Sequence, residues 1–212
     1  MNLVILGATG GTGRLVVEQA LAAGHTVTAL VRSPEKLTSS NSRLRVITGR
    51  ATDAQDVARA LADADALIST LGGSGSVIAD STQAIVDAAR RTGLKRVVVL
   101  SSFLVERQRL NAPMRLATGL VMGAMVKDKT LGEEMLRSSG LDWTIIYASP
   151  LTDGPATGSV SVLPEGAKWG MSDRISRADV ATWLVQTVTG AQHSRRSVAI
   201  TGGTGTGSNR AA

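Results

Sequence analysis

The sequence predicts an α/β fold built on a parallel sheet, and three observations support this prediction. Short apolar runs rich in Val, Ile and Thr alternate with longer stretches of helical periodicity along the 212 residues. The first apolar run ends in a cluster of glycines, and a helical stretch follows it directly. The run RVVVL at 96–100 is continuously apolar, as in a strand that helices cover on both faces. Repeated strand–helix units of this kind place the strands side by side in one parallel sheet.

Seven strands and five helices are expected in alternation. The strands fall at 3–6, 26–31, 44–48, 66–70, 96–100, 143–147 and 197–201, and the helices at 14–23, 53–62, 77–92, 113–138 and 177–189. Gly24 and Gly93 stand where two of these helices should end. Ser176 and Asp179 have the spacing of a capping box, which would open the last helix. Residues 156–168 are the least regular stretch and are compatible with a short strand or hairpin.

The amino-terminal segment MNLVILGATGGTG contains three glycines with the spacing GxxGxxG. Gly7 would end the strand in a tight turn, Gly10 would let the backbone approach a pyrophosphate, and Gly13 would let the helix pack closely on the sheet. The helix that follows presents free N–H groups and the positive end of its dipole to an anion. An ordinary glycine-rich turn is the alternative, but a strand before the motif and a helix after it favour a dinucleotide site.

These features together predict a single Rossmann-type domain over residues 1–202, with a doubly wound parallel sheet. The expected strand order is 3-2-1-4-5-6 with a seventh strand, and the cofactor should cross the sheet edge between strands one and four. The remaining residues, 203–212, are rich in Gly, Ser and Thr and are expected to form a flexible tail.

Composition excludes several classes of function. The chain has no cysteine, which excludes disulfides, thiolate catalysis and thiolate metal sites, and its two isolated histidines do not suggest any other metal site. The net charge is +6, but the arginines are scattered and aromatics make up only 2%, so nucleic-acid binding is not expected. The positive field would instead attract an anionic ligand such as a phosphorylated cofactor. The first apolar run is too short for a signal peptide or a membrane span, so we expect a cytoplasmic protein without membrane contact.

The segment ALVRSP at the end of the second strand bears on the choice of cofactor. In NAD enzymes an acidic residue at this place bonds the ribose 2′-hydroxyl, whereas an arginine accommodates the 2′-phosphate of NADP. Arg32 occupies this place, and its guanidinium could bind a phosphate in a bidentate fork. NADP(H) is therefore favoured over NAD(H); the alternative is that Arg32 is a solvated residue at the start of a loop.

Several segments occur in the order found in a known family: GATGGTGR, ALVRSP, ISTLGG, VVVLSS, DKTLGEEMLRSSGLDWTIIYASPLTDGP and ISRADVA. In these segments the chain resembles the atypical short-chain dehydrogenase/reductases. Within them it is most similar to the NAD(P)H-binding group that contains biliverdin-IXβ/flavin reductase and the nitrogen-metabolite-repressor-like proteins. The resemblance covers nearly the whole chain. The glycine motif is specific for the fold, while SGLDWTI and LTDGP are fairly specific for the subgroup.

The resemblance implies roles for individual residues. The residues that match the pyrophosphate loop are Gly7, Thr9, Gly10, Thr12 and Gly13, and Arg32 matches the reader of the 2′-phosphate. The residues that match a loop along the cofactor are Thr70, Leu71 and Gly72. Those expected around the nicotinamide are Ser101 and Ser102 at the end of strand five, Lys129 as the active-site lysine, and Ser149, Pro150 and Leu151 near the carboxamide.

Two departures from the family pattern affect the chemistry. The tyrosine-dependent short-chain enzymes use Tyr-x-x-x-Lys, but Met125 stands four residues before Lys129, and the only tyrosine, Tyr147, belongs to strand six. Tyrosine-dependent alcohol or ketone chemistry is therefore not expected. The family usually has an acidic residue after strand three, where this chain has Arg50. Arg50 could stack on adenine, add to phosphate binding or face solvent, and Asp53 is then better interpreted as a helix cap.

Simpler interpretations exist for some of these residues. Ser101 and Ser102 could merely end a strand, and Lys129 in the sequence KDK could belong to a solvated face. The apolar residues of 113–126 have helical spacing, so most of them should pack in the core or at a subunit interface. Their members are Met114, Leu116, Leu120, Val121, Met122, Met125 and Val126. Some of the methionines could instead line an adaptable pocket for a flat ligand. A serine hydrolase is excluded because no G-x-S-x-G elbow is present.

The function predicted from these residues is that of an NADPH-dependent reductase acting on a flat conjugated acceptor, such as a flavin, quinone or tetrapyrrole. Ser102 and Lys129 are the candidates for polar assistance to the reaction. A non-catalytic NADP(H)-binding redox sensor is the main alternative, and an epimerase or isomerase is a third. The expected partner is a small-molecule acceptor, and the protein is expected to be a monomer or homodimer without a metal.

Overall fold

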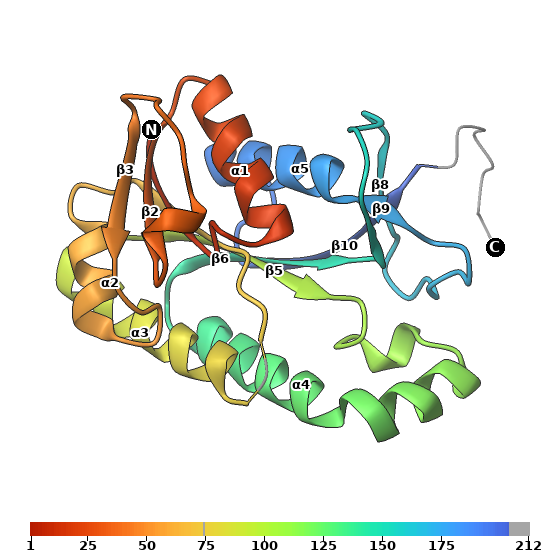
Figure 1. Ribbon diagram of the computed structural model, residues 1–212. Helices are drawn as coiled ribbons and strands as arrows, with labels where there is room; N and C mark the ends of the chain where they lie inside the picture. The colour runs from red at the N-terminus through yellow and green to blue at the C-terminus, as the bar shows by residue number, and fades with distance from the viewer. Residues whose placement is uncertain (74, 204–212) are drawn as a thin grey trace.

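The computed structural model describes residues 1–73 and 75–203, apart from the side chains at positions 117, 120 and 121. Its main sheet has eight strands in the order β3-β2-β1-β4-β5-β6-β10-β8 (Figure 1). The strands are β1 (Asn2–Leu6), β2 (Thr26–Val31), β3 (Leu44–Thr48), β4 (Ala66–Ser69), β5 (Arg96–Ser102), β6 (Asp142–Ala148), β8 (Val160–Val162) and β10 (Arg196–Gly202). All pairs are parallel except β8 on β10. The predicted order 3-2-1-4-5-6 is confirmed, β10 is the predicted seventh strand, and the irregular stretch 156–168 supplies the antiparallel edge strand β8.

Helices cover both faces of the sheet. In Figure 1, α1 (Gly11–Ala22) and α5 (Arg177–Thr189) lie on one face, and α2 (Ala54–Leu61), α3 (Val77–Thr92) and α4 (Ala112–Ser138) lie on the other. Two short 3₁₀ turns, η1 (Pro34–Lys36) and η2 (Arg107–Arg109), and a two-stranded sheet of β7 (Leu151–Thr152) and β9 (Ile175–Ser176) complete the elements. The helix α1 begins three residues before its predicted start, because the glycines of the motif form its first turn.

The buried strands divide the core into two apolar layers. Alternate side chains of β1 serve opposite faces: Leu3 and Ile5 pack towards α1 and α5, and Val4 and Leu6 towards α2, α3 and α4. All four are at most 1% exposed, which explains why the run is continuously apolar rather than alternating.

The apolar residues of the helix at 113–126 only partly pack in the core, and the alternative of a subunit interface stays a prediction for the others. Val126 is buried, and Met114 and Met125 pack against the core, as expected. Leu116 is 70% exposed and Met122 is also exposed, so neither packs in the core of this chain. Figure 1 shows the reason: the amino-terminal half of α4 extends beyond α3, its neighbour on this face.

Two further expectations concern residues that the structure largely leaves out. Of the expected tail at 203–212, only Gly203 lies within the described residues. The side chains of Leu120 and Val121 also lie outside the part that the structure describes. Among the helices that the structure describes, none combines the length and apolar character that a membrane crossing requires.

The first turn of α5 is anchored by Asp179. The amide of Asp179 donates to the Ser176 hydroxyl at 2.9 Å, as in the predicted capping box. The Asp179 carboxylate does not return to the Ser176 amide but accepts from the Ser176 hydroxyl and from Thr157 and Gly158. Burial opposes ionisation of this carboxylate, but the hydrogen bonds from Ser176, Thr157 and Gly158 lower its pKa on balance. Asp179 thereby fixes the loop before β8 to the helix.

We expect Asp179→Asn to lower the free energy of unfolding by about 2–4 kcal/mol near neutral pH, because an amide cannot accept from all these donors. The folded-state pKa of Asp179 lies below its ordinary value of 3.8, so the contribution of the carboxylate is present above that pH and is lost as the pH falls through the folded-state pKa. Urea unfolding at several pH values measures this. The difference from the wild type should shrink in acid, and a difference that stays constant would contradict the assignment. Glu165→Gln, at an exposed carboxylate, serves as the control.

Candidate functional site

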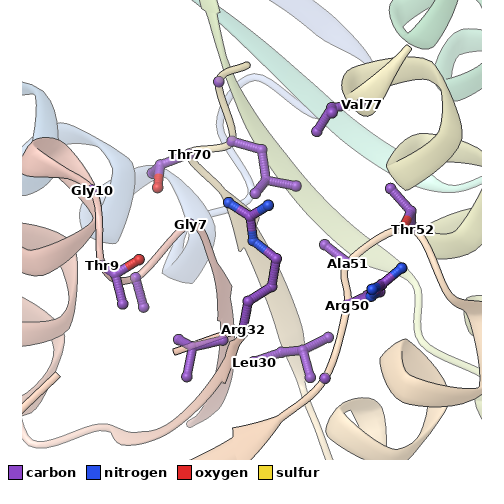
Figure 2. A pocket seen from close by; sticks show the side chains of 15 residues that line it. Gly7, Thr9, Gly10, Leu30, Arg32, Arg50, Ala51, Thr52, Thr70 and Val77 are labelled. Carbon is purple, nitrogen blue, oxygen red and sulfur yellow. The ribbon is translucent and has the colours of Figure 1, made fainter. Parts of the chain in front are cut away.

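A cavity of about 480 Å³ opens at the carboxyl ends of β1, β2, β3 and β4. It lies where the chain order of the strands reverses, between β1 and β4, the position at which doubly wound sheets bind ligands. Its lining comes from four strand ends and the start of α3, and Figure 2 shows these segments converging on one space. The lining residues are Gly7, Ala8, Thr9, Gly10, Leu30, Val31, Arg32, Gly49, Arg50, Ala51, Thr52, Thr70, Leu71, Gly72 and Val77.

The turn between β1 and α1 depends on its glycines. Gly7 has a φ of +82°, which side chains other than hydrogen disfavour, and its carbonyl accepts from the Gly10 amide at 2.9 Å. A Cβ atom on Gly13 would overlap this same carbonyl and would lie 2.8 Å from the Thr70 hydroxyl oxygen. The helix α1 therefore packs directly on the turn and on the end of β4.

The amino-terminal end of α1 is open to the cavity. Gly10 is its N-cap, no described side chain caps the helix, and its first turn has no acidic residue. The free amides and the positive end of the helix dipole can therefore bind an anion such as a pyrophosphate. Of the five residues predicted for this loop, Gly7, Thr9 and Gly10 line the cavity. Thr12 and Gly13 are buried behind them in the first turns of α1.

The charged side chains that line the cavity are both arginines. Arg32 follows β2 and Arg50 follows β3, and both are exposed. No acidic residue is among the described lining residues. Asp53 does not line the cavity; it caps α2 by accepting from the amides of Gln55 and Asp56, so its predicted role as a helix cap is confirmed.

A second, much smaller cavity of about 10 Å³ lies between β4, β5, α3 and α4, and Leu71 lines both cavities. Ser101 and Lys129 both line it, and their expected place beside the nicotinamide stays a prediction. Lys129 and Asp128 are buried while Lys127 is exposed, so KDK is not simply a solvated face. The Asp128 carboxylate accepts from the amides at the start of α3, those of Ile78 at 2.9 Å and Ala79 at 3.0 Å. Asp128 thus ties α4 to the helix that follows the loop at Leu71.

Glu133 lies at the centre of a buried hydrogen-bond network beside this small cavity. Its carboxylate accepts from the Ser101 hydroxyl at 2.6 Å and from the Tyr147 hydroxyl at 2.5 Å. Arg137 donates to both Glu133 and Tyr147, at 3.0 Å and 2.7 Å. This network was not among the residues predicted from the sequence. Its signal was present, because Glu133 is four residues after Lys129 on one helix face and Tyr147 pairs with Ser101 across β5 and β6.

The network sets the protonation of its members. Burial, followed by the charge of Glu133, raises the pKa of Tyr147, so its hydroxyl remains protonated and donates to Glu133. Burial lowers the pKa of Lys129, and the charges of Glu133 and Asp128 oppose this shift. Since the Ser101 hydroxyl donates its proton to Glu133, the Ser101 oxygen is left as an acceptor toward other groups.

The remaining predicted residues lie outside both cavities. The Ser102 oxygen accepts from the Leu104 amide at 3.3 Å, and the buried Ser149 hydroxyl donates to Thr201 at 3.1 Å. The Pro150 carbonyl accepts from the Ile175 amide at 3.1 Å, and Leu151 begins β7. The structure therefore brings together the glycine turn, Arg32 and the loop after β4, and separately Ser101 and Lys129, but it gives Ser102 and the segment after β6 no place on either cavity.

We expect Glu133→Gln to lower the free energy of unfolding by about 2–4 kcal/mol, because the neutral amide keeps one acceptor oxygen instead of two and loses the charge that pairs with Arg137. Glu134→Gln changes the neighbouring exposed carboxylate in the same way and should have an effect of about 0.5 kcal/mol or less. Urea unfolding followed by circular dichroism compares the two variants. Equal stability of both variants would mean that the Glu133 network contributes nothing to folding.

Comparison with known proteins agrees with this geometry. An uncharacterised chloroplastic protein of Arabidopsis thaliana is 32% identical over 94% of this chain and 76% of its own length. A protein described as an uncharacterised sugar epimerase of Bacillus subtilis is 28% identical over 96% of this chain and 95% of its own. ChuY, described as an anaerobillin reductase from Escherichia coli, superposes with a TM-score of 0.79 at 27% identity, covering 94% of this chain and 96% of its own.

A short-chain dehydrogenase/reductase from Veillonella parvula, solved in complex with NADP, has the same fold. Its TM-score is 0.84 at 20% identity, and the match covers 96% of this chain and 95% of that one. The profile of the NAD(P)H-binding family matches residues 7–191, which include the glycine turn, both arginines and the Glu133 network. This chain therefore has a Rossmann-type fold and belongs to the NAD(P)H-binding family.

Proposed function

We propose that this protein is an NADPH-dependent reductase that passes hydride to a flat conjugated acceptor such as a flavin, quinone or tetrapyrrole. The observation that carries the proposal is the cavity at the strand switch point, which combines an uncapped helix end, a glycine turn and two arginines. Two relatives named as reductases support it. They are ChuY and a (4-alkanoyl-5-oxo-2,5-dihydrofuran-3-yl)methyl phosphate reductase of Streptomyces griseus, the latter 26% identical over 94% of this chain.

The residues present fit a dinucleotide. The amides of the turn at Thr9 and Gly10 and of the first turn of α1 would bind the diphosphate, because no described side chain or acidic residue competes for them. Arg32 would bind the 2′-phosphate, and the loop Thr70–Gly72 would lie along the cofactor. When bound, the reduced nicotinamide supplies the hydride. The protein would mainly orient the two reactants and exclude water.

The polar groups near the expected reacting end favour a particular class of acceptor. Met125, four residues before Lys129, cannot transfer a proton, and the Ser101 proton is held by Glu133. We assign polar assistance to Lys129 and Ser102, and a carboxamide contact to Ser149, Pro150 and Leu151. A conjugated acceptor does not need a strong proton donor from the protein, because its reduced anion is stabilised by delocalisation and can take a proton from water.

A turnover assay tests the proposal directly. The purified protein should consume NADPH, followed by its absorbance, in the presence of at least one member of a panel of flavins, quinones and linear tetrapyrroles. The NADPH consumption should depend on the acceptor concentration and should fall when Lys129 is replaced by Met. Tight NADPH binding without turnover across the panel would contradict a reductase.

That contrary outcome corresponds to a second function, a redox sensor that binds NADP(H) and alters its contacts with a partner without turnover. One observation favours it. Ser101 and Lys129 face a cavity of only about 10 Å³, which has no room for an acceptor in the described arrangement. A sensor would show different affinities for NADP⁺ and NADPH, measured by calorimetry, together with no acceptor-dependent rate.

The preference for the phosphorylated cofactor is a separate expectation. Arg32→Ala should weaken NADPH binding by about 1.5–3 kcal/mol, the range for a hydrogen bond to a charged group, and leave NADH binding nearly unchanged. Calorimetric titration of both cofactors measures the two effects. An equal loss for NADH and NADPH would show that Arg32 does not contact the 2′-phosphate.

A further inference from the structure

Arg50 lines the cavity, and no contact with the cofactor has been assigned to its side chain. The strands β2 and β3 are parallel neighbours with Val31 opposite Thr48, so Arg32 and Arg50 follow two adjacent strand ends. The amide of Gly49 donates to the carbonyl of Val31 at 2.9 Å and continues this pairing beyond the strands. Figure 2 shows Arg32 between the glycine turn and the segment Arg50–Thr52. Both side chains therefore belong to the same end of the cavity.

The backbone that carries Arg50 is held rigidly. The Asp56 carboxylate accepts from the Arg50 amide at 2.8 Å and pairs with Arg59 at 2.5 Å. A Cβ atom on Gly49 would lie 2.8 Å from the Asp56 carboxylate and 2.9 Å from Leu30, so the chain passes too close to these groups for a larger residue. Arg50 thus projects from a fixed point, so little backbone entropy is lost when this residue binds a ligand.

The Arg50 guanidinium itself has no ion-pair partner among the described residues, and the same is true of Arg32. Asp56, the carboxylate near Arg50, is committed to the Arg50 amide and to Arg59. Arg32 and Arg50 bring two positive charges to one cavity, and no carboxylate is among its described lining residues. Two like charges on one cavity disfavour each other unless a negative charge is bound there. An anionic ligand placed between them would relieve this repulsion.

The chemistry of adenosine favours a phosphate as the group that Arg50 binds. An arginine can stack on an adenine ring, but stacking leaves its N–H donors without acceptors. The adenine amino group is a hydrogen-bond donor, and an arginine has only donors, so Arg50 cannot accept from it. A phosphate offers acceptor oxygens and negative charge, which a guanidinium fork matches in geometry and sign.

We infer that Arg50 is a second determinant of specificity for the 2′-phosphate, so that Arg32 and Arg50 bind this group from two neighbouring strands. The inference rests on the proposed function, because it concerns the same cofactor cavity. It adds that discrimination between the phosphorylated and unphosphorylated cofactor depends on two guanidinium groups rather than on Arg32 alone.

Two fragments isolate the contribution of the 2′-phosphate: adenosine 2′,5′-bisphosphate and adenosine 5′-monophosphate, which differ only by that group. Calorimetric titrations compare the wild type with Arg50→Ala, Arg50→Lys and a control. Arg45→Ala is the matched control, since Arg45 is an exposed arginine of β3 that does not line the cavity. Thermal unfolding of each variant verifies that it is folded.

Arg50→Ala should weaken the binding of the bisphosphate by about 10- to 100-fold and that of the monophosphate by less than about 3-fold. Arg50→Lys should fall between Arg50→Ala and the wild type, because it keeps the charge but loses the fork. Arg45→Ala should leave both fragments nearly unaffected. An equal loss of both fragments with Arg50→Ala would overturn the inference in favour of a contact with adenine, and no loss for either fragment would also overturn it.

The same titrations separate this inference from the proposed function. If the wild type binds neither fragment, or binds both equally, the assignment of NADPH as cofactor fails and the inference fails with it. If the wild type prefers the bisphosphate, and Arg32→Ala removes this preference while Arg50→Ala does not, the cofactor assignment stands. Only the role of Arg50 is then overturned.

Discussion

The close approach of α1 to the turn after β1 is the constraint on which the site depends. Gly13 leaves no room for a Cβ atom between the helix and the Gly7 carbonyl, and the same carbonyl holds the Gly10 amide. This packing points the first turn of α1 at the space above the sheet edge. The end of β4 takes part as well, because the Thr70 hydroxyl donates to the Leu6 carbonyl at 3.1 Å and lies against Gly7 and Gly13. The glycines therefore fix the relation of β1, α1 and β4, and with it the floor of the cavity.

The described charged groups that line the cavity are all positive. The helix end contributes a positive partial charge, and Arg32 and Arg50 contribute full charges from two strand ends. Nearby acidic residues are used for structure: Asp53 caps α2, and Asp56 holds the Arg50 amide and Arg59. The basic residue Arg14 also has a structural role. Its guanidinium donates to the carbonyls of Thr9 and Lys36 and joins the glycine turn to η1. The described lining of the cavity therefore carries positive charges without a carboxylate to pair with them.

Much of the fold could be predicted from the sequence because its signals are local. Apolar runs such as 96–100 and the glycines around Gly10 specify strands, turns and their order by steric and periodic rules that involve few neighbours. The Glu133 network could not be predicted in this way, since it joins α4 to β5 and β6 through residues 32 and 14 positions apart in the chain. The exposure of Leu116 could not be predicted either. Helical spacing shows which side chains share a face of the helix, but it does not show where the neighbouring helix that covers this face ends.

The Glu133 network and the hydrogen bonds of Asp128 to α3 tie α4 to the cofactor site. Two consecutive residues of this helix have different roles. Asp128 binds the start of α3, and Lys129 lines the small cavity with Ser101. Because Leu71 lines both cavities and Val77 begins α3, a shift of α3 would move the wall of the cofactor cavity and the cover of Lys129 together. Two buried carboxylates on one helix therefore connect α4 to its neighbours: Asp128 binds the start of α3, and Glu133 binds the ends of β5 and β6. This connection gives the buried polar residues of α4 a role in positioning the site that does not require any of them to touch the substrate.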